Sequence, residues 1–401
     1  MELRRIECRP APADPLRMRL VGEVVYDDRP GAIEEYWYEI PRELEASIGW
    51  SGNPWLAALL PLAATLGEGL RIALPVDDVL LRGAPDLVAI WRSWYPRLHA
   101  VEVEAEAEAP RSAGSATGVF FSGGVDSFFT ALRNRHEARG TLPIDDLISV
   151  RGLDIPLANP DALGRRTARL EGIARDLGLG LVEVATNLKE TRLRTADWSW
   201  LWHGSGIVSA GLMLEGRYRR LMVASTFDYG KLVPLGSHPM TDPLLSTAAT
   251  RVLHDGAGFD RADKVEYVSR YDVALRSLHV CWRRKDESNC GGCEKCLRTM
   301  LLLELSGRLG KAKTFPEGPV DLGKISRIFL GSAGVTAYYQ RMRSLAKSSG
   351  RTDVVRAVDR CLQRSAWRRR LMRVAEVCSS RRFFWRAASS LRRLAQAGMI
   401  R

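Results

Sequence analysis

One run of six residues constrains the fold of this 401-residue chain more than any other feature: Ser122-Gly123-Gly124-Val125-Asp126-Ser127. It follows the apolar residues 119–121 and precedes a helix-like segment, which predicts a strand that turns directly into a helix. Glycines let the backbone bend and approach a ligand closely. Amide groups at the start of a helix are unpaired, and the helix dipole favours negative charge there. The sequence therefore predicts an anion-binding loop at the end of a strand.

The side chains of this run add hydrogen-bond donors and one acid. Ser122, Ser127 and the nearby Thr130 offer hydroxyl groups, and Asp126 offers a carboxylate. A carboxylate beside phosphates repels them unless a cation intervenes, so Asp126 predicts a bound Mg²⁺ ion. The alternative is a Gly-Gly turn that binds no ligand, and such a turn needs neither Asp126 nor the two serines.

Strands and helices alternate along the chain after residue 118. We predict strands at 119–121, 146–150, 181–185 and 221–225, and helices at 127–138, 160–177 and 206–215. This alternation predicts an α/β fold with a parallel, doubly wound sheet covered by helices on both faces. Ligands bind beyond the carboxyl ends of such strands. The rule places residues 122–127, 151–154 and 226–228 along one rim.

Three regions are predicted from the composition and the pattern. Residues 1–112 form an α+β region of unknown role, with strands at 21–26, 35–40 and 70–74, helices at 53–66 and 87–95, and an exposed edge strand within 102–109. Residues 113–310 form the α/β domain, entered through a linker rich in Gly, Ser and Ala. Residues 311–401 form a basic, all-helical region, in which we expect two or three short helices after residue 347.

Four of the seven cysteines lie within sixteen residues: Cys281, Cys290, Cys293 and Cys296. Tetrahedral zinc needs four thiolates at about 2.3 Å, and Gly291 and Gly292 allow the backbone to curl round an ion. Four thiolates complete the coordination of zinc, which favours a structural site over a catalytic one. An iron–sulfur cluster is the alternative, because it also takes four cysteines.

These two motifs resemble a known family. Residues 122–127 resemble the SGGxDS signature of the PP-loop ATP pyrophosphatases. Residues 290–298, CGGCEKCLR, resemble the zinc-binding end of their QueC-like branch, the 7-cyano-7-deazaguanine synthases. The resemblance covers residues 118–305. It implies a PP-loop fold that binds ATP and Mg²⁺, with zinc in a structural role.

The resemblance also implies a reaction. A carboxylate of the substrate attacks the α-phosphate of ATP, pyrophosphate leaves, and an amine or ammonia then displaces AMP to give an amide, which that branch converts to a nitrile. A free carboxylate is unreactive because its leaving group would be oxide, so adenylation supplies the leaving group. The protein has to neutralise phosphate charge and align the attack.

Several residues carry expected roles. The resemblance implies that the loop of Ser122, Gly123, Gly124, Val125, Asp126 and Ser127 binds the nucleotide and that backbone groups at Arg151 meet the adenine. Asp126 and Ser127 would also act in catalysis. Lys231 would neutralise phosphate charge and Asp228 would hold Mg²⁺ or orient the substrate; the alternatives are a solvated loop lysine and an Asx-turn before Gly230. Residues 201–207 and 228–243 differ from the family pattern, so the acceptor region is changed.

The net charge of +12 belongs to the C-terminal segment. Residues 341–401 contain seventeen lysines and arginines against three acids, a net charge of +14, which leaves −2 for the rest. Such a segment can bind nucleic acid, an acidic protein or an acidic membrane surface, or it can be a solvated helical appendage. No apolar run is long enough to span a membrane, and the charged N-terminus does not resemble a signal peptide, so we expect a cytoplasmic protein. We also expect a homo-oligomer.

Three functions follow from these observations. The first is an ATP-dependent ligase that forms a C–N bond from a carboxylate carried by a small molecule, a modified base or a protein terminus. The second is an adenylating enzyme that modifies tRNA or another nucleic acid. The third is a non-catalytic nucleotide-binding protein.

Overall fold

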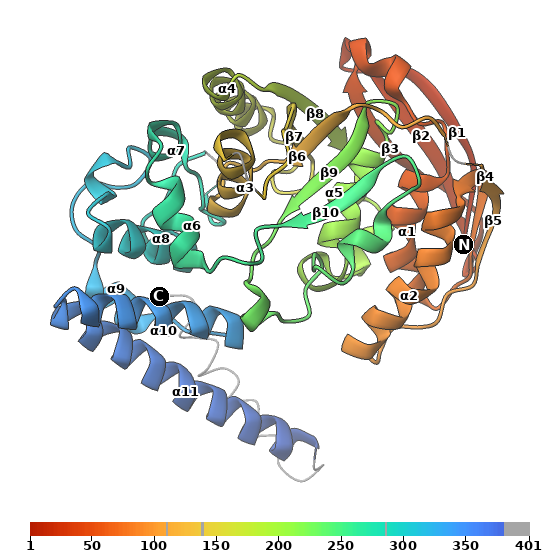
Figure 1. Ribbon diagram of the computed structural model, residues 1–401. Helices are drawn as coiled ribbons and strands as arrows, with labels where there is room; N and C mark the ends of the chain where they lie inside the picture. Colours follow the sequence, from red (N-terminus) through yellow and green to blue (C-terminus); the bar gives the residue numbers. More distant parts are fainter. Residues whose placement is uncertain (110, 138–139, 285–286, 381–401) are drawn as a thin grey trace.

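The computed structural model describes residues 1–109, 111–137, 140–284 and 287–380 (Figure 1). Ten strands form one sheet in the order β10-β9-β6-β7-β8-β3-β2-β1-β4-β5. Neighbouring strands are mostly parallel, and the antiparallel pairs are β8–β3, β3–β2 and β2–β1. The predicted α/β class with a largely parallel sheet is confirmed. The strands are β1 (Glu2–Ala11), β2 (Asp14–Tyr26), β3 (Arg29–Pro41), β4 (Leu70–Asp77), β5 (Val103–Glu108), β6 (Ala116–Phe120), β7 (Asp146–Arg151), β8 (Gly180–Thr186), β9 (Tyr218–Ala224) and β10 (Arg251–Asp255).

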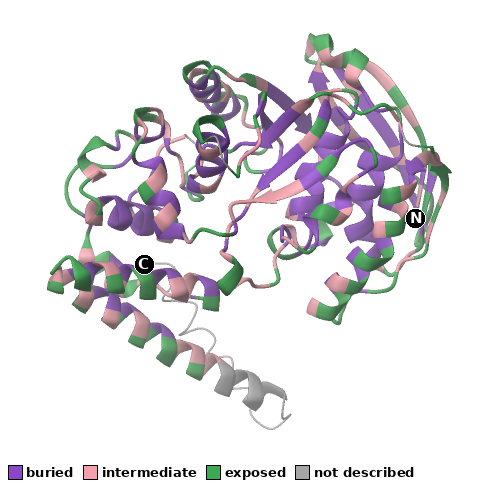
Figure 2. Ribbon diagram, viewed as in Figure 1, coloured by how far each residue is buried: buried purple, intermediate pink, exposed green. Residues whose placement is uncertain are grey.

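Helices cover both faces of the sheet (Figure 1). Helices α1, α2 and α5 share one apolar core with one face, whereas α3, α4 and the helices from α6 onward share a second core with the other. Figure 2 shows the buried residues concentrated between these layers. The helices up to residue 305 are α1 (Asn53–Leu66), α2 (Asp78–Trp94), α3 (Val125–His136), α4 (Pro160–Leu177), α5 (His203–Leu212), α6 (Arg261–Val268), α7 (Asp272–Ser277) and α8 (Glu294–Leu305).

Helix α1 shows why these segments fold as they do. Pro54 lies in its first turn, where a missing amide hydrogen costs nothing. Gly67 ends the helix at a φ of 74°, a conformation that glycine adopts without strain. The helix is apolar on every side, and residues 53–64 are all buried. The predicted bounds of α1 and α4 agree with the structure.

Strands on both sides of residue 112 belong to the same sheet. β3 of the N-terminal region pairs with β8 of the α/β region, with Tyr38 opposite Thr186 and Glu39 opposite Ala185. The first apolar core likewise contains residues from both regions. The acidic segment 103–108 is the edge strand β5, as its alternation of Glu and small residues predicted. The domain boundaries themselves stay a prediction.

The C-terminal region is helical from residue 333 to residue 380, apart from a short turn at residues 349–351. It contains α10 (Ala333–Ser348) and α11 (Thr352–Ser380), preceded by the short α9 (Leu322–Arg327). The expectation of short helices is wrong for residues 352–380, which form one helix of 29 residues. The rest of the predicted tail, 381–401, lies outside the described residues. Among the described helices, none has the length and apolar character needed to cross a membrane.

Candidate anion-binding cleft and metal centre

The Ser-Gly-Gly loop joins β6 to α3, as predicted. Gly123 has a φ of 76°, and a Cβ at this position would collide with the Arg169 guanidinium. Gly124 is the N-cap of α3, and no side chain donates or accepts a capping hydrogen bond there. The amides of the first helical turn, residues 125–127, therefore have neither an intrahelical partner nor a capping side chain. The loop has the backbone geometry of an anion site.

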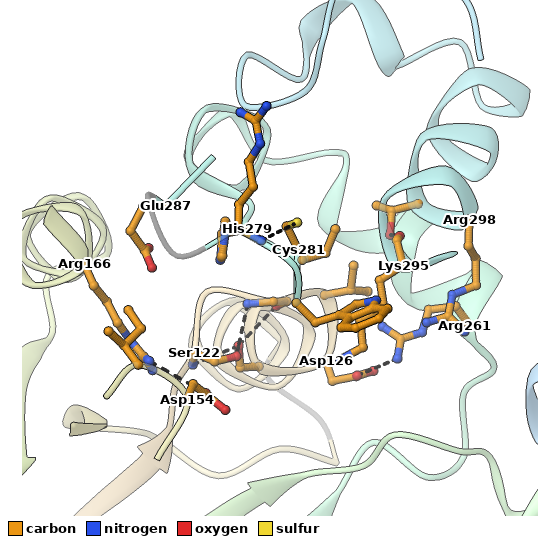
Figure 3. A pocket seen from close by; sticks show the side chains of 18 residues that line it. Ser122, Asp126, Asp154, Arg166, Arg261, His279, Cys281, Glu287, Lys295 and Arg298 are labelled. Carbon is orange, nitrogen blue, oxygen red and sulfur yellow. Dashed lines mark hydrogen bonds and ion pairs between the residues drawn. The ribbon is translucent and has the colours of Figure 1, made fainter. Parts of the chain in front are cut away.

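This loop forms one wall of a cleft of about 220 Å³ (Figure 3). The other walls come from the segment after β7, from α4, α6 and α8, and from the segment that leads into the cysteine cluster. The charged residues that line the cleft are Asp126, Asp154, Arg166, Arg261, Arg284, Glu287, Lys295 and Arg298. Five of these are cations and three are acids, so the lining carries a net positive charge.

Several side-chain nitrogen atoms in the cleft wall are buried and have no hydrogen-bond partner among the described residues. They are the Nε atoms of Arg166, Arg261 and Arg298 and the Nε2 atom of His279. The three arginines are 6%, 8% and 5% exposed. Buried N–H groups are nearly always hydrogen-bonded, and each one that lacks a partner costs about 1–3 kcal/mol. A bound anion would supply the missing acceptors.

Asp126 is paired with cations in this structure. Its Oδ2 accepts a hydrogen bond of 2.6 Å from Arg261, and its Oδ1 lies 3.5 Å from Nζ of the buried Lys264. Lys264 also donates to the carbonyl of Ser225 at 2.6 Å. Because both oxygens of Asp126 already face cations, this arrangement does not fit a magnesium site. The Mg²⁺ ion stays a prediction.

Asp154 and Arg166 lie on the opposite side of the cleft from Arg261 (Figure 3). The Arg166 Nη1 atom lies 3.7 Å from Asp154 Oδ2. Desolvation in the cleft opposes ionisation of Asp154, whose side chain is 58% exposed, but the charges of Arg166 and nearby cations outweigh it and lower the pKa of this carboxyl. Arg166 is buried, whereas its neighbour on the same helix, Arg165, is exposed.

The structure does not bring every predicted site residue to the cleft. Asp126, Ser127, Ser122 and Gly124 line it, but Lys231, Asp228 and Arg151 do not. Lys231 donates to Asp228 at 2.8 Å, and the other oxygen of Asp228 accepts from the amide of Gly230, which is an Asx-turn. Arg151 lies 3.9 Å from Glu183.

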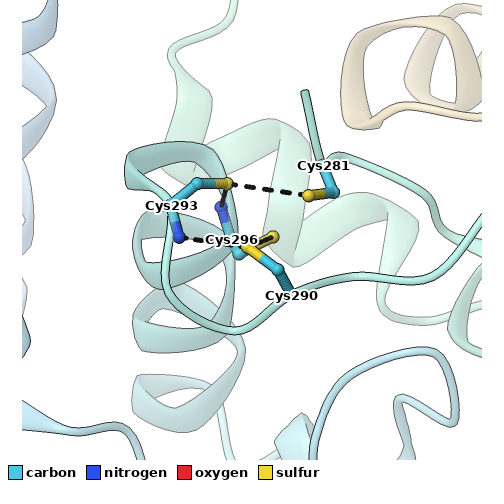
Figure 4. A group of neighbouring side chains, drawn as sticks. All are labelled: Cys281, Cys290, Cys293 and Cys296. Atoms are coloured by element: carbon cyan, nitrogen blue, oxygen red, sulfur yellow. Dashed lines mark hydrogen bonds between the residues drawn. The ribbon is translucent and has the colours of Figure 1, made fainter. Parts of the chain in front are cut away.

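The four cysteines meet in space (Figure 4). Their sulfur atoms all lie within 4.8 Å of one another, with 3.9 Å between Cys290 and Cys296 and 4.0 Å between Cys281 and Cys293. Tetrahedral zinc with bonds of 2.3 Å requires sulfurs about 3.8 Å apart. Backbone amides donate to Cys290 and Cys293, as expected around a thiolate ligand. This cluster can hold a metal ion such as zinc.

The cysteine segment is bound directly to the Ser-Gly-Gly loop. The amide of His279 donates to the carbonyl of Gly123 at 2.9 Å. Arg169 of α4 donates to the carbonyls of Ser122 and Ser277 and to Glu287, at 3.3, 3.0 and 2.8 Å. The cysteine cluster and the cleft are therefore parts of one structural unit.

Helix α8 begins at the metal centre and delivers two cations to the cleft. Its N-cap is Cys293, whose sulfur accepts a hydrogen bond of 3.4 Å from the amide of Cys296. Lys295 and Arg298 of its first turns line the cleft. The sequence pattern pointed to the cysteines but not to Lys295, Arg261 or His279, because no local signal distinguishes them from surface residues.

In comparisons with known proteins, no family model, no curated protein and no solved structure matches this chain.

Proposed function

We propose that this protein is an ATP-dependent, AMP- and pyrophosphate-forming ligase that activates a carboxylate. The observation that carries the proposal is the set of buried Nε donors of Arg166, Arg261 and Arg298, which have no partner among the described residues and lie in the cleft that the Ser-Gly-Gly loop lines. Each of these arginines lies near a carboxylate, but its buried Nε–H group still lacks an acceptor, and a bound anion would supply one. A polyphosphate chain supplies several charged acceptors within one cleft.

The chemistry follows from these groups. The first-turn amides of α3 would bind phosphate oxygens, and the arginines would stabilise charge that moves onto the leaving pyrophosphate. A carboxylate oxygen attacks the α-phosphorus, the bond to the bridging oxygen breaks, and its electron pair leaves with pyrophosphate. An amine then displaces AMP, forms the C–N bond and loses a proton. The resemblance of residues 122–127 and 290–298 to the QueC-like branch supports this order of events.

The cysteine cluster would hold zinc in a structural role. Four sulfurs close the coordination shell and leave no position for a substrate, so the metal would stabilise the fold rather than react. When bound, it would fix the segment 277–293, which carries His279 and Cys281 into the cleft wall.

Calorimetry with ATP tests nucleotide binding, and pyrophosphate release across a panel of carboxylic acids tests the reaction. Ser127→Ala should weaken ATP binding about tenfold by removing a hydroxyl of the loop. The exposed linker residue Ser115 provides the control Ser115→Ala. If ATP binds without pyrophosphate release from any acid, the non-catalytic alternative is favoured instead.

A second candidate, an adenylating enzyme that acts on nucleic acid, is favoured by α11. Arg356, Arg360 and Arg364 are exposed at four-residue spacing, about 6 Å apart along one face, and Trp367 on the same helix is 64% exposed. Within the described residues, none of these three arginines has a hydrogen bond or an ion pair. Arginines in a row with an exposed aromatic ring suit the phosphates and bases of a single-stranded nucleic acid.

Binding of a fluorescent single-stranded RNA oligonucleotide at several salt concentrations tests this candidate. Replacing Arg356, Arg360 and Arg364 by Gln should weaken binding and reduce the salt slope by about 2. The control replaces Arg29, Arg219 and Arg251, which are exposed elsewhere, and changes the net charge equally. Equal losses in both triple variants, or binding only to anionic vesicles, would contradict it.

A further inference from the structure

Lys295 differs from the other cations of the cleft. Arg261 is paired with Asp126 at 2.6 Å, Arg166 lies 3.7 Å from Asp154, and Arg298 lies 3.4 Å from Glu294. Arg284 donates to Ser288 at 2.9 Å. The side chain of Lys295, by contrast, has neither a hydrogen bond nor an ion pair to any described residue, and it is exposed within the cleft. It is a positive charge that is available to a ligand.

The place of Lys295 in its helix is locally unfavourable. It is the second residue of α8, one turn from Arg298, and cations near a helix N-terminus oppose the helix dipole. Acidic residues are favoured at that position, and the preceding residue, Glu294, follows the rule. A residue that breaks a local rule without a compensating contact within the protein points to a functional constraint.

The cysteine cluster determines where Lys295 lies. The residue lies between Cys293 and Cys296 in the sequence, and both are predicted metal ligands. The sulfur of Cys293 also caps the helix. The lysine therefore has a fixed Cα position with a flexible, solvent-accessible side chain. Figure 3 shows it beside Arg261, on the same side of the cleft as Asp126.

We propose that Lys295 binds the terminal phosphates of the nucleotide and remains bound to pyrophosphate as it leaves, an inference that rests on the proposed function. When the bond between the α-phosphorus and the bridging oxygen breaks, the electron pair moves onto that oxygen and pyrophosphate gains negative charge. An unpaired ammonium group adjacent to that oxygen's phosphate stabilises the added charge. The step needs no proton from Lys295, which stays an ammonium ion throughout.

The test compares the binding of inorganic pyrophosphate, ATP and AMP to the full chain and to Lys295→Met. Pyrophosphate and ATP should bind about ten times more weakly to the variant, whereas the affinity for AMP should change less than about twofold, because AMP lacks the terminal phosphates. The exposed Lys347 of α10 gives the matched control Lys347→Met, which should bind all three ligands as the unaltered chain does.

The outcomes separate this inference from the proposed function. If the unaltered chain binds none of the three ligands, the proposed function fails. Two results would overturn this inference if the unaltered chain does bind ATP. One is that Lys295→Met binds pyrophosphate as tightly as the unaltered chain does. The other is that the variant loses as much affinity for AMP as for pyrophosphate. Zinc content and circular dichroism show whether the variant is folded, and Lys295→Arg should recover part of the pyrophosphate affinity if Lys295→Met is unstable.

Discussion

The amide of His279 donates a hydrogen bond of 2.9 Å to the carbonyl of Gly123. These two residues lie more than 150 positions apart, and they join the segment that enters the cysteine cluster to the loop that forms the candidate anion site. Each side of this contact is held in place by other bonds, with Arg169 linking Ser122 and Ser277. Events at the metal centre should therefore affect anion binding in the cleft.

Removing the metal should destabilise the protein and weaken pyrophosphate binding. Replacing Cys290 by Ser removes one of four sulfurs, so we expect loss of bound zinc and a fall of at least about 10 °C in the melting temperature. Metal analysis, thermal unfolding and calorimetry with pyrophosphate measure the three effects. Cys361 is buried outside the cluster, and Cys361→Ser should leave the zinc content unchanged. Equal zinc content in both variants would contradict the predicted ligand set.

Gly123→Ala should distort the anion-binding loop. An alanine at a φ of 76° costs about 1–2 kcal/mol, and its Cβ would also displace the Arg169 guanidinium. Chemical denaturation should show this loss of stability, and pyrophosphate affinity should fall with it. Gly164 of α4 has open space around it, so Gly164→Ala should instead stabilise the helix by about 0.5–1 kcal/mol. A neutral effect of Gly123→Ala on both measurements would show that the loop tolerates a side chain.

Arg169→Leu should cost about 3 kcal/mol of unfolding free energy, because it leaves the carboxylate of Glu287 without its partner. The Glu287 side chain is only 9% exposed. Adding Glu287→Leu should restore much of this stability, as removing both charges eliminates the unpaired acid. Pyrophosphate affinity should stay low in the double variant, since the bonds from Arg169 to Ser122 and Ser277 are still missing. Full recovery of affinity would show that Arg169 has no positioning role.

Glu215 should make stability depend on pH. Burial raises the pKa of this carboxyl from 4.5 to about 7, although Asn53 donates to both of its oxygens at 3.0 Å. Below pH 4.5 the carboxyl group is protonated in both the folded and the unfolded chain. Between pH 4.5 and 7 it ionises only in the unfolded chain, so folding stability falls by about 3 kcal/mol and then levels off.

Glu215→Gln should abolish this dependence. Urea denaturation at pH 4.5 and pH 8 gives the unfolding free energies of the variant and of the unaltered chain. Relative to the unaltered chain, the variant should be about 3 kcal/mol more stable at pH 8 than it is at pH 4.5. The exposed Glu106 of β5 offers a control, Glu106→Gln, for which that difference should stay constant. A Glu215→Gln curve parallel to that of the unaltered chain would rule out the raised pKa.

Local patterns were sufficient to predict the main elements. The α1 and α4 helices and the edge strand β5 have signals within their own residues: a proline or asparagine at the start, a glycine at the end, and alternation along the strand. β1 and β10 were not predicted. β1 carries five charged side chains among ten residues, and it is a strand because β2 and β4 pair with it on either side.

Lys231 and Asp228 show the limit of strand-end reasoning. The rule that ligands bind beyond the carboxyl ends of parallel strands indicates an edge of the sheet, but it does not give the direction of a side chain. These two residues lie three positions apart and are paired with each other within one turn. A charge that is satisfied locally has less reason to bind a ligand.

By itself, the sequence determined the strand–loop–helix geometry at residues 122–127, the grouping of Cys290, Cys293 and Cys296 and the concentration of positive charge after residue 341. Each depends on residues adjacent in the chain, whose backbone freedom and spacing act over short distances. Only the tertiary structure decided that Arg166, Arg261 and Lys295 meet in one cleft. These residues come from three separate helices, and their convergence is set by how apolar faces pack against a sheet, which no local pattern encodes.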